Sequence, residues 1–461
     1  MSVAPETVRT STRVPTPLAT PRGRVYATLQ GLRGYPVLPS VRRLLEWERL
    51  PVAEFERLQA QRLRAILAHA REHVPLYRTG RWKDALGTGE DGLAAWPVLE
   101  REALRERYAD LVAQPRPGKL ITHETSGTTG NPTQIAFTPE SDAWGWAHRY
   151  RGLLWHGVPI GVRALRLSNK RRPLRDALLD QRSVPALDTT TAIEEAIAYL
   201  RDERPPLVSG PPSALFYLAR HMRERGMARP LASFARVGGE QLFPFQRTEI
   251  ERVVARRVIN SYGCTEIGAL AGECPAGSMH VYADHVHLEI FRDDAPVPVG
   301  EFGDIVATAL HNPAMPLVRY RVGDCGRLST KKCPCGRPHP VLLELQSRGS
   351  DVLDAKDGTT RHGAQLAESL GRVFADAGGE RVRQAQFVQL DRRRWQVLVE
   401  PAGSSPAAAA DDPDFAAIAN HIAELLRDVL GSDAVVETRF VAAIPRENGK
   451  FRYYRLASRN G

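Results

Sequence analysis

The sequence predicts a large layered α/β domain with a β-rich portion, followed by a small α+β domain. Three observations lead to this fold class. With 461 residues, the chain is too long for one ordinary hydrophobic core. Short apolar segments alternate with helical ones between residues 120 and 346, which is typical of a layered α/β domain. The alternation changes after residue 350, so we expect a second domain there.

The larger domain is expected over residues 26–350. Residues 51–77 place apolar side chains near helical spacing and predict a docking helix. We expect strands at RALRLS, PLVSG, FARVGGE and RVINSYG, helices at TAIEEAIAYLRD and PPSALFYLAR, and antiparallel strands at VHLEIFRDD and GDIVATAL. In a domain of this kind, ligands bind in loops at the ends of strands.

The smaller domain is expected over residues 351–461. AQFVQLDRRRWQVLVEP predicts two strands, DFAAIANHIAELLRDVLG an amphipathic helix, and AVVETRFVAAIP a further strand, while PAGSSPAAAADDPD is expected to be a low-complexity loop. Residues 1–25 carry Arg, Thr and Pro without an apolar core segment. We therefore expect a disordered leader there and not a secretory signal.

The formal charge of +10 suits nucleic acid, an anionic membrane surface or anionic small substrates, and it does not choose among them. Because the basic residues are scattered and no apolar run could span a bilayer, we expect neither nucleic acid nor a membrane as partner, and a cytoplasmic location. Only seven of the 63 basic residues are Lys, so a Lys in a motif position is more informative than an Arg would be.

One segment, HETSGTTGNPTQIAFTPE, concentrates hydroxyls and glycines before an apolar run. Ser126, Thr128 and Thr129 can present hydroxyls to an anion, and the interleaved Gly127 and Gly130 leave backbone N–H groups unobstructed. The segment has no G-x-x-x-x-G-K-[ST] pattern, so it is not a Walker loop. Taken alone, a polar hairpin turn explains it equally well.

Three further segments carry polar side chains in a fixed order. NSYGCTEIGA places Tyr262 beside Thr265 and Glu266 after an apolar strand. PLVRYRVGDCGRL puts Asp324 where a carboxylate could accept both hydroxyls of a ribose, and IPRENGKFR carries Lys450 in a turn. Singly, each of these residues could be a cap, a core aromatic or a solvated charge.

Together these segments resemble the phosphate loop and the Y-G-x-[ST]-E, Y-R-x-G-D and P-x-x-x-G-K segments of the adenylate-forming ligases, and within them the phenylacetate–CoA ligase family. The segments EFERLQAQRLRAILAHAREHVPLYR and GGEQL extend the resemblance over residues 45–455. It implies an enzyme that uses ATP and Mg²⁺ to adenylate a carboxylic acid, aryl or arylacetic, and then transfers the acyl group to coenzyme A.

The resemblance also implies a role for each matching residue. The phosphate loop would hold the β- and γ-phosphates, Glu266 would bind Mg²⁺, Asp324 would hold the ribose, and Lys450 would bridge carboxylate and phosphate oxygens. A compact ammonium suits that bridge, because the planar fork of Arg prefers one bidentate partner. The other nucleotide residues would be Gly239, Glu240, Tyr262, Gly263, Thr265 and Arg348. The candidates for the acyl pocket are Phe216, Tyr217, Gly238 and Tyr262.

A structural zinc site is the second prediction. Its four candidate ligands are Cys274, His280, Cys333 and Cys335. Three Cys and one His form a closed tetrahedral site, which would stiffen the rim of the active site. Some members of the family bind zinc at matching positions, although the C-x-C spacing is shorter than the usual knuckle. Free buried thiols are the alternative, and Cys264 and Cys325 are expected to be packing residues.

The sequence departs from the family pattern at two places. Asn131 stands where many relatives have Lys in the phosphate loop. At the expected domain junction, Ser350 replaces the first Asp of a pair whose second member is Asp351, and Gly363 replaces a Pro. The acceptor therefore stays open between coenzyme A, a carrier-protein thiol and an amine. A non-catalytic nucleotide-binding scaffold and a homodimer also stay open.

Overall fold

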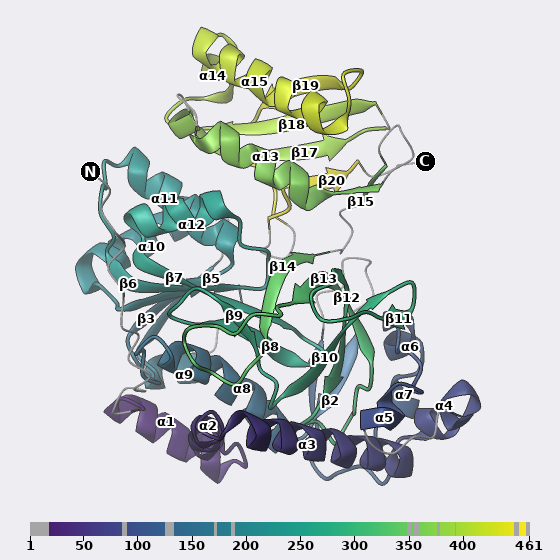
Figure 1. The fold of residues 1–461 in the computed structure, drawn as a ribbon. Helices are drawn as coiled ribbons and strands as arrows, with labels where there is room; N and C mark the ends of the chain where they lie inside the picture. Colours follow the sequence, from purple (N-terminus) through teal and green to yellow (C-terminus); the bar gives the residue numbers. More distant parts are fainter. Residues whose placement is uncertain are drawn as a thin grey trace. The chain divides into compact units, whose positions relative to one another are not determined.

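The computed structural model describes residues 18–84, 90–124, 133–169, 173–185, 190–347, 352–354, 360–375, 379–391, 393–446 and 451–457. The chain separates into two compact units, which we call unit 1 (Met1–Val162 and Ile259–Leu345) and unit 2 (Arg163–Val258 and Gln346–Gly461). A large sheet and a separate smaller sheet near the C-terminus give a mixed α/β fold (Figure 1). This architecture confirms the predicted fold class.

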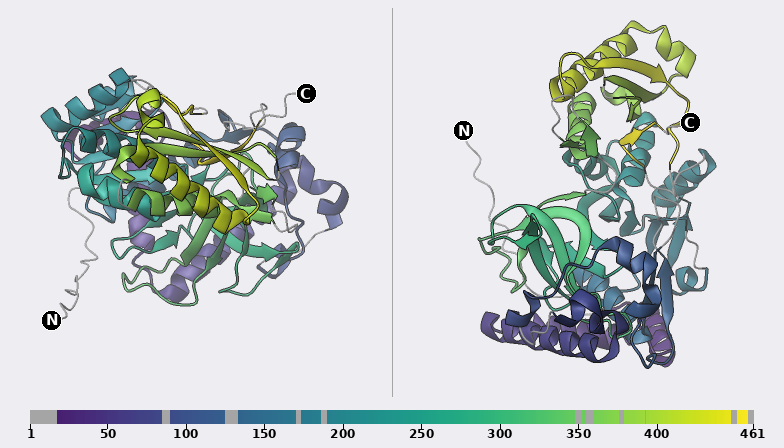
Figure 2. Two further views of the ribbon diagram at one scale, coloured as in Figure 1. Left: turned by 90° about the horizontal axis from the view of Figure 1, so that it is seen from above. Right: turned by 90° about the vertical axis from the view of Figure 1, so that its right-hand side faces the viewer.

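The helices of unit 1 come mostly from the first third of the chain. They are α1 (Pro21–Leu32), α2 (Val37–Trp47), α3 (Val52–His73), the 3-10 turn η1 (Pro75–Arg78), α4 (Gly80–Asp84), α5 (Glu90–Leu93), α6 (Arg101–Glu106), α7 (Tyr108–Leu111) and α8 (Pro139–Leu154). Helix α3 confirms the predicted docking helix. Helix α1 begins at Pro21, with the Thr20 side chain accepting a hydrogen bond from the Gly23 amide, which corrects the predicted end of the leader at residue 25. Figure 2 shows α1, α2 and α3 in purple along one side of the unit.

The strands of unit 1 pair in antiparallel fashion wherever the register is defined. The hairpin β1 (Ile121–Glu124) and β2 (Gln134–Phe137) stands apart, and the strand order of the sheet is β11-β10-β12-β13-β14-β9-β8-β7. The strands are β7 (Ala255–Cys264), β8 (Gly268–Glu273), β9 (Met279–Val281), β10 (Val286–Arg292), β11 (Ala295–Pro296), β12 (Gly303–Ala309), β13 (Tyr320–Leu328) and β14 (Val341–Ser347). Their apolar side chains pack with those of α3 into one core.

The first part of unit 2 alternates strands and helices. Strands β3 (Ala164–Leu167), β4 (Gln181–Val184), β5 (Leu207–Gly210) and β6 (Ala232–Gly238) are parallel, in the order β6-β5-β3-β4. The helices are α9 (Pro173–Leu178), α10 (Thr190–Glu203), α11 (Pro212–Glu224) and α12 (Pro244–Val253). In parallel sheets of this kind, ligands generally bind in the loops after the strands.

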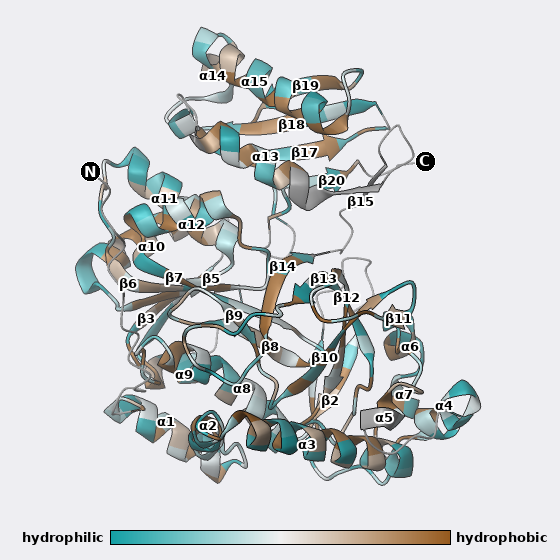
Figure 3. Ribbon diagram, viewed as in Figure 1, coloured by the Kyte–Doolittle hydropathy of each residue, from teal (hydrophilic) through white to brown (hydrophobic). Residues whose placement is uncertain are grey.

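The C-terminal part of unit 2 has a sheet of its own. Its elements are β15 (Val352–Asp354), β16 (Thr360–His362), α13 (Gly363–Ala375), the 3-10 turn η2 (Gly379–Arg381), β17 (Val382–Gln389), β18 (Arg394–Pro401), α14 (Pro406–Ala410), α15 (Pro413–Leu430), β19 (Val435–Phe440) and β20 (Tyr454–Leu456). The sheet order is β19-β18-β17-β20, and β17 and β18 are coloured as hydrophobic along most of their length in Figure 3.

This C-terminal region confirms the predicted strands and amphipathic helix. One prediction was wrong: the alanine run after Pro406 forms α14 and not a loop, because the Ser405 hydroxyl caps it by accepting from the Ala408 amide. The expected domain boundary near residue 350 lies outside the described residues and stays a prediction. No helix among the described residues is long and apolar enough to cross a bilayer.

Candidate active site and metal centre

Tyr262 and Asp324 are hydrogen-bonded to each other in unit 1. Tyr262 lies near the end of β7 and Asp324 lies in β13, and the Tyr262 hydroxyl donates to Oδ2 of Asp324 at 2.8 Å. Burial and this carboxylate raise the pKa of Tyr262 well above its ordinary value, so the phenol stays protonated and remains a donor. The structure thus brings together two residues that the sequence predicted at the nucleotide, and it leaves Asp324 partly exposed.

Glu266 follows β7 and is buried. Its Oε1 atom accepts a hydrogen bond from the hydroxyl of Tyr320, at the start of β13, at 3.1 Å. Sequence reasoning missed Tyr320. The pairing of β13 with β12 is irregular between Arg321 and Cys325, so the spacing of Tyr320 and Asp324 alone could not have placed Tyr320 at this site. Thr265, which precedes Glu266, is exposed.

Gly263 lies between these residues, where β7 and β8 approach closely. A Cβ atom on Gly263 would lie 2.3 Å from the carbonyl oxygen of Gly268, so only glycine fits. The pairing of the two strands shifts register between Tyr262 and Gly263. The close approach therefore fixes the end of β7, and with it Tyr262, beside β8.

Gly238, Gly239 and Glu240 lie in unit 2 at the end of β6. The Glu240 carboxylate accepts two backbone hydrogen bonds, from Ser213 at the start of α11 at 3.2 Å and from Phe451 at 3.3 Å. Phe451 directly follows Lys450 in the sequence. The structure therefore brings the chain just after Lys450 next to the GGE segment, within one compact unit.

Phe216 and Tyr217, candidates for the acyl pocket, lie on α11 and are buried. The ring of Phe216 packs edge-on against Phe374, with 5.0 Å between centroids, and the Tyr217 hydroxyl donates to Oε1 of Glu400 at 2.6 Å. These contacts hold α11 against the C-terminal part of unit 2. A role in the acyl pocket stays a prediction for both residues.

Several predicted residues lie outside the described part of the chain, and their roles stay predictions. They are Ser126, Gly127, Thr128, Thr129, Gly130 and Asn131 of the phosphate loop, Arg348, Ser350 and Asp351 of the junction, and Lys450.

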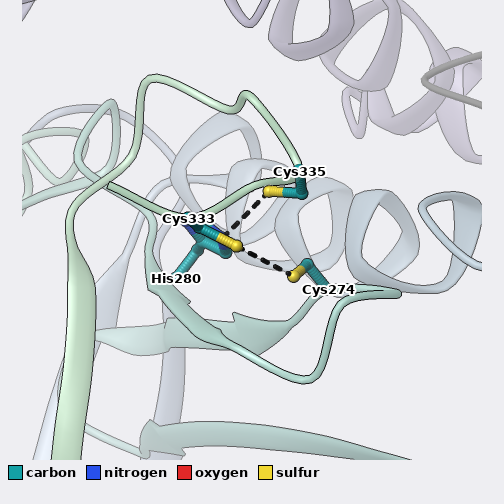
Figure 4. Close-up of side chains that lie close together, drawn as sticks. All are labelled: Cys274, His280, Cys333 and Cys335. Carbon is teal, nitrogen blue, oxygen red and sulfur yellow. Dashed lines mark hydrogen bonds between the residues drawn. The ribbon is translucent and has the colours of Figure 1, made fainter. Parts of the chain in front are cut away.

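The four predicted metal ligands come together in unit 1, and we call them the Cys3His cluster (Figure 4). They are Cys274 after β8, His280 in β9, and Cys333 and Cys335 in the loop between β13 and β14. Their donor atoms all lie within 4.8 Å of one another. The Sγ atoms of Cys274 and Cys333 are 3.8 Å apart, and Sγ of Cys335 is 3.2 Å from Nε2 of His280. Ligands of one tetrahedral zinc ion have this spacing.

The surroundings of His280 prepare it for a metal. Its Nδ1 atom donates to the backbone oxygen of His339 at 2.9 Å, which leaves Nε2 with a free electron pair toward Cys335. The hydrogen bond from the Cys274 thiol lowers the pKa of the Cys335 thiol, which favours the thiolate form that binds a metal ion. The residues present therefore fit a zinc ion.

A second group of metal-binding residue types lies buried in the same unit, and we call it the histidine cluster: His148, His285 and His311. Its hydrogen bonds occupy most of the ring nitrogens. Nδ1 of His148 accepts from Arg151 at 3.0 Å, so Nε2 carries the proton, and Nε2 of His285 donates to a backbone oxygen at 3.1 Å. For His311, Nε2 lies 2.7 Å from the backbone oxygen of Asp284, and Arg62 reaches Nδ1 at 2.9 Å.

Only one electron pair, on Nδ1 of His285, is then left for a metal in the histidine cluster. Two guanidinium groups lie against the rings, and Arg151 is fully buried with Asp284 in an ion pair of 2.5 Å. These guanidinium groups donate to the ring nitrogens that face them, so those nitrogens are not available to a metal ion. The three histidines therefore lie as close together as metal ligands do, but they do not offer enough free electron pairs to bind a metal ion.

Sequence comparison finds relatives among the phenylacetate-coenzyme A ligases. The chain is 29% identical to the Thermus thermophilus enzyme over 347 residues, which cover 67% of this chain and 73% of that protein. It is 28% identical to the Escherichia coli enzyme over 354 residues, or 70% and 77% of the two chains. No family model matches the chain.

Solved structures share the fold. A 2-hydroxyisobutyryl-CoA ligase in complex with 2-HIB-AMP superimposes with a TM-score of 0.74 over 89% of this chain and 91% of that chain, at 21% identity. An anthranilate CoA ligase in complex with anthranoyl-AMP gives a TM-score of 0.51 over 72% and 64%, at 13% identity. The chain is therefore similar in sequence to phenylacetate-coenzyme A ligases and shares the fold of solved CoA ligases.

Proposed function

We propose that the protein adenylates a carboxylic acid with ATP and passes the acyl group to coenzyme A. The hydrogen-bonded pair of Tyr262 and Asp324 carries this proposal, because it presents a carboxylate in the strand where the family holds the ribose. Relatives named as coenzyme A ligases, matched over two thirds of the chain or more, support the overall reaction.

The chemistry sets clear demands on the site. A carboxylate resists nucleophiles because its carbonyl is electron-rich and oxide is a poor leaving group. In the first step, a carboxylate oxygen attacks the α-phosphorus of ATP and pyrophosphate leaves. In the second step, the thiolate of coenzyme A attacks the acyl carbon and AMP leaves. The first step brings two anions together, so the site must supply positive charge.

Different residues of the chain bind the nucleotide, hold the metal ion and contact the reacting groups. Asp324 accepts the ribose hydroxyls, and the protonated phenol of Tyr262 keeps that carboxylate oriented. Glu266 is the residue to hold Mg²⁺, which would supply positive charge beside the phosphates. Lys450 bridges the carboxylate and the α-phosphate. The hydrogen bond from the Phe451 amide to Glu240 supports that role, because it ties the chain next to Lys450 to the GGE segment.

We propose an aromatic acid, aryl or arylacetic, as the substrate. The relatives named phenylacetate-coenzyme A ligase support an arylacetic acid. The structural neighbour named 2-hydroxyisobutyryl-CoA ligase is named for an aliphatic acid, so the test must include both classes.

We further propose that the Cys3His cluster holds one structural Zn²⁺. The ion would join the β8–β9 turn to the loop after β13, the strand of Asp324. With four protein ligands it has no open position for a substrate, so its role is to hold these two segments together.

A screen for pyrophosphate release tests the function. The full-length protein is incubated with ATP, Mg²⁺ and single acids from aryl, arylacetic and aliphatic series, with and without coenzyme A. We expect release with an aromatic acid in the absence of coenzyme A, and multiple turnovers when coenzyme A is added. If pyrophosphate is released in multiple turnovers only when a carrier protein or an amine is present, that molecule and not coenzyme A is the acceptor. Release with no acid of any class would contradict the proposed function.

A further inference from the structure

Helix α1 exposes an apolar stripe. Val25, Leu29 and Leu32 are 52%, 41% and 82% exposed, and they are three of the nine large hydrophobic side chains exposed to this degree among the described residues. At roughly 100° per residue, the three side chains lie within about 60° of one another around the helix. Tyr26 and Ala27 bury a different face of the helix. Single exposed apolar residues are common, but three on one face of one helix indicate a partner.

The surroundings of this stripe are strongly basic. The chain has no Asp or Glu from residue 7 to residue 45. Within that span, five Arg side chains of α1, α2 and their connection are exposed: Arg22, Arg24, Arg33, Arg42 and Arg43. Arg22 and Arg24 of α1 precede the stripe, and Arg33 directly follows the helix. The Arg side chains of α1 and its C-terminal end therefore flank the exposed apolar face on both sides along the chain.

Charge and hydrophobicity together select the partner. A second copy of the chain would bring two Arg-rich faces together, and like charges repel. Nucleic acid would attract the Arg side chains and leave the apolar stripe in water. An anionic bilayer satisfies both features, because apolar side chains enter the boundary between headgroups and acyl chains while Arg contacts the headgroups.

We propose that α1 docks the protein on the surface of a bilayer that contains anionic phospholipids. Val25, Leu29 and Leu32 enter the interface, and Arg22, Arg24 and Arg33 contact headgroup phosphates or carboxylates. Three apolar side chains bury little area, so docking is reversible and depends on salt. This differs from the expectation drawn from the whole-chain charge, which treated the basic residues as scattered.

Co-sedimentation of the full-length protein with lipid vesicles tests the proposal. One set of vesicles is phosphatidylcholine alone, and the other is a mixture of phosphatidylcholine and phosphatidylserine. We expect about tenfold or more stronger binding to the mixture, lost at high salt. The variant Leu29→Ser/Leu32→Ser should bind about tenfold more weakly. The variant Arg22→Gln/Arg24→Gln/Arg33→Gln should bind about 100-fold more weakly.

Matched controls separate α1 from the rest of the surface. Leu174→Ser/Val299→Ser changes two other exposed apolar residues, and Arg57→Gln/Arg64→Gln/Arg105→Gln changes three other exposed Arg residues. Both controls should bind like the wild type. All variants should keep the thermal unfolding midpoint of the wild type, since the changed side chains are exposed.

Three results would overturn the proposal. Equal sedimentation with both kinds of vesicle would remove the role of anionic lipid. Unchanged binding of Leu29→Ser/Leu32→Ser would show that the stripe does not enter the bilayer. A concentration-dependent dimer that this variant abolishes would show that the stripe belongs to a second copy of the chain.

Discussion

The Cys3His cluster and the histidine cluster of unit 1 both bring together residue types that bind metals. They differ in how many of their donor atoms are already occupied by hydrogen bonds. In the first, the backbone of His339 takes up Nδ1 of His280 and leaves Nε2 open toward Cys335. In the second, hydrogen bonds occupy His311 and the acceptor nitrogen of His148. Proximity alone therefore does not make a metal site. The number of free electron pairs on the donor atoms decides it.

Replacement of one cysteine should have the largest effect. The variant Cys333→Ser removes one of four ligands, so we expect the zinc content to fall from about one per chain to near zero. The free energy of unfolding should fall by about 5 kcal/mol or more, because binding of a structural zinc contributes to folding directly. Elemental analysis and urea unfolding measure the two quantities.

The matched control for this change is Cys325→Ser. Cys325 is buried and its thiol contacts Asp304, outside the Cys3His cluster, so this variant should keep its zinc. A wild-type protein that carries no zinc after preparation without chelators would contradict the metal assignment.

Loss of the buried ion pair beside the histidine cluster should have the second-largest effect on the free energy of unfolding. Arg151→Met leaves the fully buried Asp284 without its partner, and we expect a loss of about 3 kcal/mol in the free energy of unfolding. The double variant Arg151→Met/Asp284→Asn should recover part of this loss, since it removes the uncompensated charge. If the double variant were as unstable as the sum of its single changes, the two residues would not be coupled as the structure has them.

The histidine cluster should also make stability depend on pH. Burial lowers the pKa of His285 from 6.5 to about 4, and burial also holds the pKa values of His148 and His311 well below 6.5. Below pH 6.5 the unfolded chain takes up protons that the folded chain refuses, so stability falls as pH falls toward 4 and is complete above 6.5. Asp284, with a pKa of about 2, stays ionised throughout this window.

The variant His285→Gln tests how much one residue of the histidine cluster contributes to this pH dependence. Between pH 7 and pH 5, His285→Gln should lose about 2 kcal/mol less than the wild type, since a shift of one pKa unit corresponds to about 1.4 kcal/mol. Urea unfolding at both pH values gives the difference. Identical pH dependence in the variant and the wild type would show that His285 is not held neutral by burial.

The smallest expected effect is on metal content. Because the histidine cluster has only one free electron pair, His148→Gln and His285→Gln should each leave the zinc content at about one per chain. Elemental analysis of the two variants checks this. A loss of metal in either variant would show that the histidine cluster binds an ion, and it would remove the contrast between the two clusters.

The same contrast shows what the sequence can predict. The Cys3His cluster was predictable because its ligands form two close pairs in the sequence, and the pairing of β9 with β8 and β14 joins them. The histidine cluster was not predictable. Its members lie on α8, before β10 and after β12, and only the tertiary packing of these distant elements brings them together.

The fold itself was largely predictable, because alternating apolar segments define most of its strands and helices. The exceptions have local causes. A serine cap and an alanine run make α14 from a segment that appeared to be a loop, and the Thr20 cap starts α1 inside the expected leader. In the candidate site, Tyr262 and Glu266 followed from motifs. Tyr320 required the geometry of a strand, because its partner Glu266 lies in another segment of the chain.

Direct detection of both products by mass spectrometry tests the proposed function most closely. The wild type and Lys450→Ala are incubated with ATP, Mg²⁺ and an aromatic acid selected by the pyrophosphate screen, first without and then with coenzyme A. We expect the wild type to form the acyl adenylate and then the acyl-coenzyme A thioester, and Lys450→Ala to bind ATP but form neither. An acyl adenylate produced by Lys450→Ala at the wild-type rate, or a wild type that forms no acyl adenylate, would contradict the account.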